Sequence, residues 1–278
     1  MTPNPHVSRL PQGFAAAVMP VTASAITTNT NGLTAGEVEI PSGDVRMPAY
    51  RAKPENGAAF PTVIVIQEIF GIHEHIKDLC RRLAKEGYLA VAPYLYAREG
   101  EVAHLSEIEE IRKVVGRVPD AQVMRDLDAT VEWSSQDGGD TSRLALTGFC
   151  WGGRIVWLYS AYTSRFNAGA AWYGRLAGHT SGLQPKNPVD VAAELKVPVR
   201  GFYGGKDAGI PLDTVEQMRL GIEAASAAAN DVSRRASRID VYPEAQHGFN
   251  ADYRPAYDPA AARDAWSKML AFFKEHNV

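Results

Sequence analysis

The chain has 278 residues, of which 45% are hydrophobic and 22% are charged, a balance typical of a soluble globular protein. Its formal net charge of −3 gives no reason to expect nucleic acid or an anionic membrane as a partner. Two cysteines, Cys80 and Cys150, are too few for a disulfide framework, and no apolar run is long enough to span a membrane.

Residues 1–33 differ from the rest, being rich in Ala, Thr, Pro and Asn with few charges. The apolar stretch 13–19 followed by Ala23-Ser24-Ala25 faintly resembles an export signal, but it is short and ends at Pro20. We therefore predict an N-terminal extension over 1–33, lying on the domain or poorly ordered, and a single domain over 34–278. The expected location is cytoplasmic, with the periplasm as the alternative.

The first elements combine a hairpin with a buried strand. Alternating segments 37–40 and 45–50 around a Pro-Ser-Gly-Asp turn predict an antiparallel hairpin. The β-branched run 62–66 predicts a strand buried on both faces. A helix is expected over 73–86, and residues 89–92 form the next central strand.

The second half alternates strands and helices. Residues 100–120 are charged and helical in pattern, and we expect them either to cover a pocket or to form a surface excursion. A crossover helix follows over 121–134. The remaining segments predict strands at 144–148, 168–174, 198–204 and 238–242, and helices from 152, over 212–229 and over 260–275. This alternation predicts an α/β fold with a mostly parallel sheet and helices on both faces.

A tight strand-to-helix turn is predicted at Gly148-Phe149-Cys150-Trp151-Gly152. Small residues two before and two after the apex let a strand turn sharply into a helix, as in a nucleophile elbow, here with a thiol at its centre. The helix N-terminus would favour a thiolate and later an oxyanion. The alternative is that Cys150 is a small buried residue.

Two further candidates follow later strands. Asp207 comes after the strand that ends near Tyr203, and His247 comes after the strand that ends at Tyr242. The order nucleophile, acid, histidine is that of α/β-hydrolases, so Cys150, Asp207 and His247 form a candidate triad. Alternatively, Asp207 forms an Asx-turn and His247 is a turn residue.

Glu68 follows the first buried strand and should lie near the elbow. A carboxylate there disfavours a thiolate, whereas the alternative is a helix-capping or surface Glu68. The backbone N–H groups of Ile69 and Trp151 are the expected oxyanion hole.

Five motifs together resemble the dienelactone hydrolase (carboxymethylenebutenolidase) family over about residues 35–278. They are Gln67-Glu68-Ile69-Phe70-Gly71, Pro93-Tyr94-Leu95-Tyr96-Ala97-Arg98, Gly148-Phe149-Cys150-Trp151-Gly152-Gly153, Gly204-Gly205-Lys206-Asp207 and His247-Gly248-Phe249. The resemblance implies an α/β-hydrolase fold in which Cys150 attacks an enol lactone or a related small activated ester, forming an acyl-enzyme. It also implies that Glu68 keeps the resting thiol protonated until substrate binds.

By the same resemblance, Arg98 matches an arginine that binds the substrate carboxylate. Tyr96, Trp172 and Tyr173 are expected either to line the pocket or to be ordinary aromatic core. The family has another arginine four residues after the catalytic histidine, where this chain has Ala251. Arg254 can take its place only if the loop folds back.

The expected partner is a small lactone or ester, bound by a monomer or homodimer without cofactor or metal. No metal-ligand spacing stands out, because His73 and His75 would point to different sides of a helix. A small-molecule-binding protein on a non-catalytic hydrolase fold is the alternative function. A peroxide-reducing thiol ranks lower because Cys80, the only possible resolving cysteine, is predicted to lie elsewhere.

Overall fold

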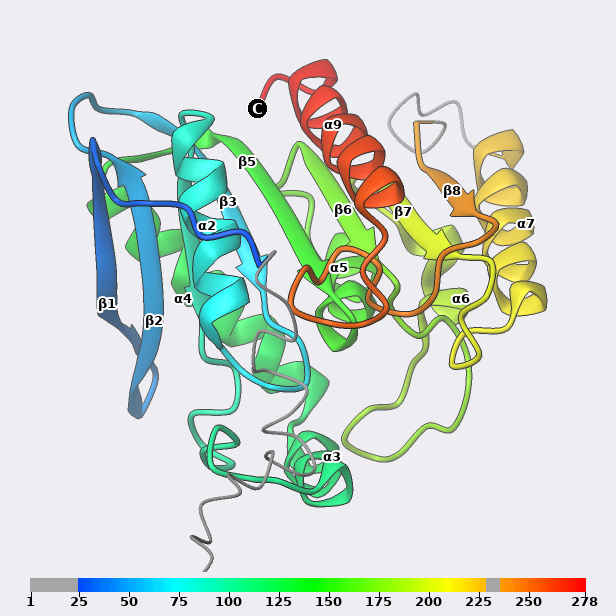
Figure 1. Cartoon of the computed structure of the whole chain (residues 1–278). Coiled ribbons are helices and arrows are strands. Elements are labelled where there is room, and N and C mark those ends of the chain that lie inside the picture. Colours follow the sequence, from blue (N-terminus) through cyan, green and yellow to red (C-terminus); the bar gives the residue numbers. More distant parts are fainter. Residues whose placement is uncertain (1–24, 229–235) are drawn as a thin grey trace, which may run out of the picture.

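The computed structural model describes residues 25–228 and 236–278 (Figure 1). Residues 1–24 of the predicted extension, including most of the signal-like segment, lie outside the described residues, as does Ala229 at the end of a predicted helix. Residues 25–32 form neither helix nor strand, and the first strand begins at Leu33.

A single eight-stranded sheet forms the centre of the described structure, in the order β1-β2-β4-β3-β5-β6-β7-β8. The strands are β1 (Leu33–Ser42), β2 (Val45–Pro54), β3 (Phe60–Ile66), β4 (Leu89–Pro93), β5 (Gly139–Phe149), β6 (Ala168–Trp172), β7 (Val199–Gly204) and β8 (Arg238–Tyr242). From β4 to β8 all neighbouring strands are parallel, whereas β1 pairs antiparallel with β2 and β2 antiparallel with β4. This arrangement confirms the predicted hairpin and mostly parallel sheet.

Strand burial follows the sequence pattern. The continuous apolar runs of β4 and β6 are buried at every residue, because helices cover both faces of the parallel part. Strands β1 and β2 alternate in exposure, as an edge hairpin with one covered face should. Both hairpin strands are ten residues long and extend beyond the predicted segments.

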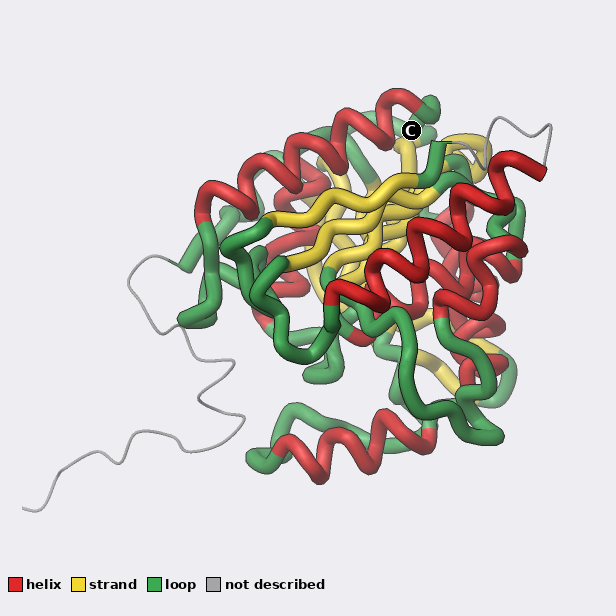
Figure 2. Tube along the Cα trace, turned by 90° about the vertical axis from the view of Figure 1, so that its right-hand side faces the viewer, coloured by secondary structure: helices red, strands yellow, loops and turns green. Residues whose placement is uncertain are grey.

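Helices cover the two faces of the sheet. They are α2 (Glu74–Lys85), α3 (Ile108–Arg117), α4 (Asp120–Gln136), α5 (Trp151–Tyr162), α6 (Pro188–Val191), α7 (Leu212–Ala228) and α9 (Pro259–Glu275), with a 3₁₀ turn η1 (Ala192–Glu194). Helices α2 and α9 lie on one face, and α4 and α5 on the other; Figure 2 shows the sheet between the two layers. No helix of the described residues has both the length and the apolar character needed to cross a membrane.

The chain reverses its direction of travel across the sheet at β3. From β3 it passes through α2 to β4 on one side, and then through α4 to β5 on the other side of β3. Ligands of open α/β sheets bind in the crevice at such a reversal, outside the carboxyl ends of the strands. Glu68 follows β3 and Cys150 follows β5, so both lie at this crevice.

The predicted helical segment 100–120 is only partly helical. Its helix is α3, while residues 101–107 form no helix and Asp120 already begins α4. Helix α3 lies beside the sheet layers rather than on either face, as both views show (Figures 1 and 2).

Candidate active site

Cys150 occupies a strained turn between β5 and α5. Its φ of 55° and ψ of −114° are unfavourable for a residue with a side chain. A Cβ on Gly148 would lie 2.4 Å from the carbonyl oxygen of Gly152, and one on Gly152 would lie 2.4 Å from that of Ile66. Only glycine fits at these two positions, so the spacing in the sequence is a packing requirement.

Asp207 and His247 are joined by a hydrogen bond. His247 Nδ1 lies 2.7 Å from Asp207 Oδ2, while Oδ1 of the same buried carboxylate accepts the N–H of Gly209. Burial lowers the pKa of His247, but the Cys150 side chain and the Asp207 carboxylate outweigh it and raise the pKa to about 10. The structure thus brings the three predicted residues together.

A cavity of about 730 Å³ lies over the three residues. Cys150, His247 and Tyr173 contribute to its floor, and Arg112 and Val115 of α3 contribute to its rim. The ring of Tyr173 stands edge-on to the imidazole of His247, with centroids 5.2 Å apart. Tyr173 therefore lines the pocket, which was one of the two alternatives expected for it, and α3 borders the pocket.

The two backbone groups expected to form an oxyanion hole also border this cavity. Ile69 lies in the tight turn after β3, in which Gly71 N–H donates to the Glu68 carbonyl oxygen, and Trp151 is the first residue of α5. Neither N–H donates to another group of the described residues. Both donors are thus available to an oxygen in the pocket.

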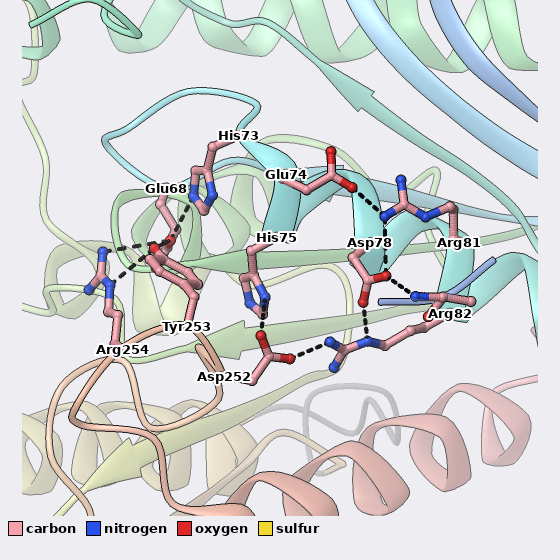
Figure 3. Close-up of polar contacts among 11 residues, drawn as sticks. Glu68, His73, Glu74, His75, Asp78, Arg81, Arg82, Asp252, Tyr253 and Arg254 are labelled. Atoms are coloured by element: carbon pink, nitrogen blue, oxygen red, sulfur yellow. Dashed lines mark hydrogen bonds and ion pairs between the residues drawn. The ribbon is translucent and has the colours of Figure 1, made fainter. Parts of the chain in front are cut away.

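Glu68 is a fully buried carboxylate with several partners (Figure 3). Its Oε2 lies 3.0 Å from His73 Nε2, accepts the Tyr253 hydroxyl at 2.9 Å, and lies 3.7 Å from a terminal nitrogen of Arg254. Burial raises the pKa of Glu68, but the opposing effect of Arg254 and His73 is larger. The pKa of Glu68 therefore lies well below its usual range. Glu68 is an ionised residue of the site, and it is neither a surface residue nor the N-cap of α2, which is His73.

The loop after His247 does fold back. Successive turns join the Ala251 N–H to the carbonyl of Gly248 and the Arg254 N–H to the carbonyl of Ala251. The guanidinium of Arg254 consequently lies 4.7 Å from the ring centroid of Phe70 and lines the pocket. Arg254 thus reaches the site that Ala251, which is buried, cannot serve.

The placement of Arg98 corrects the expectation that it binds substrate. Its guanidinium donates to both carboxylate oxygens of Asp126 at 3.0 and 3.1 Å, to the Ser42 carbonyl and to Asp44. It does not line the cavity. Two carboxylates hold it against the β1–β2 turn, so it joins the hairpin to α4.

Trp172 and Tyr96 are also corrected, because both are fully buried and neither lines the cavity. Trp172 donates its Nε1–H to Thr147 and stacks on Phe149. Tyr96 contacts the Trp151 ring edge-on and donates to the Glu68 carbonyl at 3.4 Å. Trp172 and Tyr96 thus pack against Phe149 and Trp151, the two neighbours of Cys150 in the chain.

The cations of the pocket were largely missed from the sequence. Four of them have a carboxylate partner: Arg112 with Glu109, Arg154 with Asp120, Lys206 with Glu244 and Arg254 with Glu68. Arg175 lines the same cavity, and within residues 25–228 and 236–278 it has no hydrogen-bond or ion-pair partner. It stands three residues beyond β6, so the strand-end rule that found Asp207 was a usable signal for it.

Two minor expectations concern His73 with His75, and Cys80. His73 and His75 do not point apart, because His73 precedes α2; their rings stack with centroids 6.1 Å apart. Cys80 is fully buried in α2, and burial raises its pKa well above the usual range, which does not suit a resolving thiol. The described residues hold no group of three or more His, Cys, Asp or Glu arranged for a metal ion.

The sheet order, the sharp strand-to-helix turn and the acid and histidine on later strand ends define the α/β-hydrolase fold. The family model of the dienelactone hydrolase family matches residues 47–277, and the chain belongs to this family of hydrolases.

The chain is similar to known relatives over nearly its whole length. The chain is 55% identical to the "Putative carboxymethylenebutenolidase" of Methylorubrum extorquens, covering 97% of this chain and 91% of the relative. It is 49% identical to the Escherichia coli K12 protein of the same name, covering 95% of each. The crystal structure of the "Putative Dienelactone Hydrolase" from Klebsiella pneumoniae is similar with a TM-score of 0.83 and 53% identity, covering 87% of this chain and 99% of that one.

Proposed function

We propose that Cys150 is the nucleophile of a hydrolase that opens an enol lactone, or cleaves a related small activated ester, through an acyl-enzyme. The observation that carries the proposal is the strained thiol in the pocket beside the His247–Asp207 pair. A residue kept at an unfavourable φ is expected where a function requires it. Family membership supports the hydrolase class.

The proposed reaction uses five groups of the protein in two steps. The sulfur of Cys150 attacks the carbonyl carbon, and the proton of the thiol is held by His247. Asp207 stabilises the charged ring of His247. The carbonyl oxygen becomes an oxyanion that accepts the N–H groups of Ile69 and Trp151. The bond to the ring oxygen breaks, and His247 returns the proton to the enolate. A water molecule, deprotonated by His247, then attacks the thioester, and the acid leaves with Cys150 regenerated.

The proposed role of Glu68 is electrostatic. Glu68 is a buried carboxylate that pairs with Arg254, and Arg254 lines the pocket that also holds Cys150. The ion pair between Glu68 and Arg254 therefore balances the charge of the resting site. An anionic substrate near Arg254 would change this balance.

The proposed substrate is a small molecule that carries a carboxylate. A cavity of about 730 Å³ has the size of a small-molecule site. Arg175 is the cation in the described pocket without a carboxylate partner, which favours it as the group that binds a substrate carboxylate. This role replaces the one expected for Arg98.

The test compares Cys150→Ala with Cys80→Ala as the matched control, using a carboxylated enol lactone and its uncarboxylated ester analogue. We expect Cys150→Ala to lose hydrolysis by at least about 10⁴-fold and Cys80→Ala to keep it. Mass spectrometry of the quenched wild-type enzyme should find the acyl group on Cys150. Retained hydrolysis by Cys150→Ala would refute the proposal, and stoichiometric binding without turnover by the wild type would support a binding protein.

A further inference from the structure

A second, smaller cavity adjoins the active site through Phe70, which lines both cavities. This recess has a volume of about 220 Å³. Its polar lining residues are His73, Lys77, Glu37, Glu101 and Tyr94. Cys150 and His247 line only the larger cavity, so the recess is a different compartment.

His73 connects this recess to the buried carboxylate of Glu68. Its side chain is 12% exposed, whereas the Glu68 side chain is 0% exposed, and His73 Nε2 lies 3.0 Å from Glu68 Oε2. His73 is the N-cap residue of α2 but makes no capping hydrogen bond with its side chain, which leaves the ring available to Glu68. The rings of Phe70 and Tyr253 stand edge-on to it and restrict its orientation.

Several charged or titratable groups surround the His73 ring. From the site side these are Glu68, Arg254, Tyr253 and His75, with Asp252 behind His75; from the recess side they are Lys77, Glu37, Glu101 and Tyr94. Burial lowers the pKa of His73; Glu68 raises it, and His75 and Arg254 lower it again, so that the net shift is downward. At neutral pH the ring is therefore uncharged, and its Nε2–H donates to the Glu68 carboxylate, which can only accept.

We propose that His73 is a proton route between Glu68 and water in the recess, separate from the substrate pocket. The proposal rests on the proposed function, in which an anionic substrate changes the charge balance between Glu68 and Arg254. An anionic substrate that draws Arg254 away leaves Glu68 buried with less compensation, and a buried carboxylate then binds a proton more readily. With substrate filling the main pocket, the route through His73 remains open.

The transfer conserves atoms and charge. A hydronium ion or buffer acid in the recess gives a proton to Nδ1 of the imidazole, and Nε2 gives its own proton to Glu68 Oε2. The ring ends as the other neutral tautomer, and Glu68 becomes a neutral acid. The reverse transfer restores both groups. His73 acts through Glu68 and touches no substrate.

The test compares His73→Gln with the matched control His75→Gln. Glutamine keeps an N–H that can donate to Glu68, but it cannot pass a proton through itself. His75 stacks on His73 and contacts Tyr253, yet it does not touch Glu68. We expect kcat of His73→Gln to fall by roughly tenfold or more with KM little changed. Added imidazole should restore its kcat in a saturable way, and His75→Gln should not respond to imidazole.

Two results would overturn the proposal: wild-type kcat and pH profile in His73→Gln, or a lowered kcat that imidazole does not restore. Either would leave His73 as a hydrogen-bond support for Glu68. If His73→Gln does not fold, as judged by thermal denaturation, His73→Ala serves in the same imidazole titration. Failure of the proposed function is recognised separately, because the wild type would then carry no acyl group on Cys150.

Discussion

The floor and the rim of the pocket are built in different ways. On the floor, Cys150, Asp207 and His247 follow the ends of β5, β7 and β8, and the Asp207–His247 pair is fixed by a hydrogen bond. On the rim, Arg112 of α3 has an exposed ion pair and Arg175 has no partner in the described structure. The sheet thus fixes the groups proposed for the chemistry, while loops and α3 supply the side chains that would select the substrate.

The largest expected effect is on the floor. Asp207→Asn should lower kcat by about 10³- to 10⁴-fold, because an amide neither holds the required His247 tautomer nor stabilises its charged form. Asp240→Asn is the matched control, since Asp240 lies on the neighbouring strand β8 and pairs with Arg200 outside the pocket. Steady-state kinetics of both variants measure this. Equal losses in the two variants would show that the effect is structural rather than specific to the site.

The sequence predicted the floor because its signals are local. The spacing of Gly148 and Gly152 predicted a turn at Cys150, and Asp207 and His247 after later strands favoured a nucleophile there, because the carboxyl ends of parallel strands meet at one edge of the sheet. The sheet, its hairpin and the helices on both faces followed from hydrophobic periodicity in the same way.

The rim could not be predicted, because it depends on the paths of loops. Arg98 follows β4 and was expected in the pocket, but Asp44 and Asp126, distant in the chain, hold it at the hairpin. Arg254 was ambiguous until the turns after Gly248 were known. His73 gave no signal for its contact with Glu68, since a histidine before a helix is most simply a cap.

A substitution of Arg98 tests whether this residue stabilises the fold or binds substrate. Arg98→Ala should lower the free energy of unfolding by about 2 kcal/mol, because Asp126 is left as a buried carboxylate with fewer donors. Urea denaturation measures this change. KM for the carboxylated lactone should stay the same, and a clear rise in KM in the folded variant would return Arg98 to substrate binding.

A substitution of Arg175 tests whether the rim binds a substrate carboxylate. Arg175→Ala should raise KM for a carboxylated lactone by about tenfold, equivalent to about 1.4 kcal/mol, with kcat nearly unchanged, because one charge-assisted hydrogen bond is lost. KM for the uncarboxylated ester should not change. Lys206→Ala is the control, because Lys206 lines the same cavity but already pairs with Glu244. Equal effects in the two variants would indicate general electrostatics rather than a specific contact.

The last prediction is a pH dependence of stability that arises on the floor. The pKa of His247 rises from about 6.5 in the unfolded chain to about 10 in the folded protein, so the folded protein binds its proton more tightly. The resulting stabilisation is complete below about pH 6.5 and is lost as pH rises towards 10. The difference in melting temperature between the wild type and His247→Asn should therefore narrow between pH 7 and 10. A difference that stays constant over this range would mean that Cys150 and Asp207 do not raise the pKa of His247 in the folded protein.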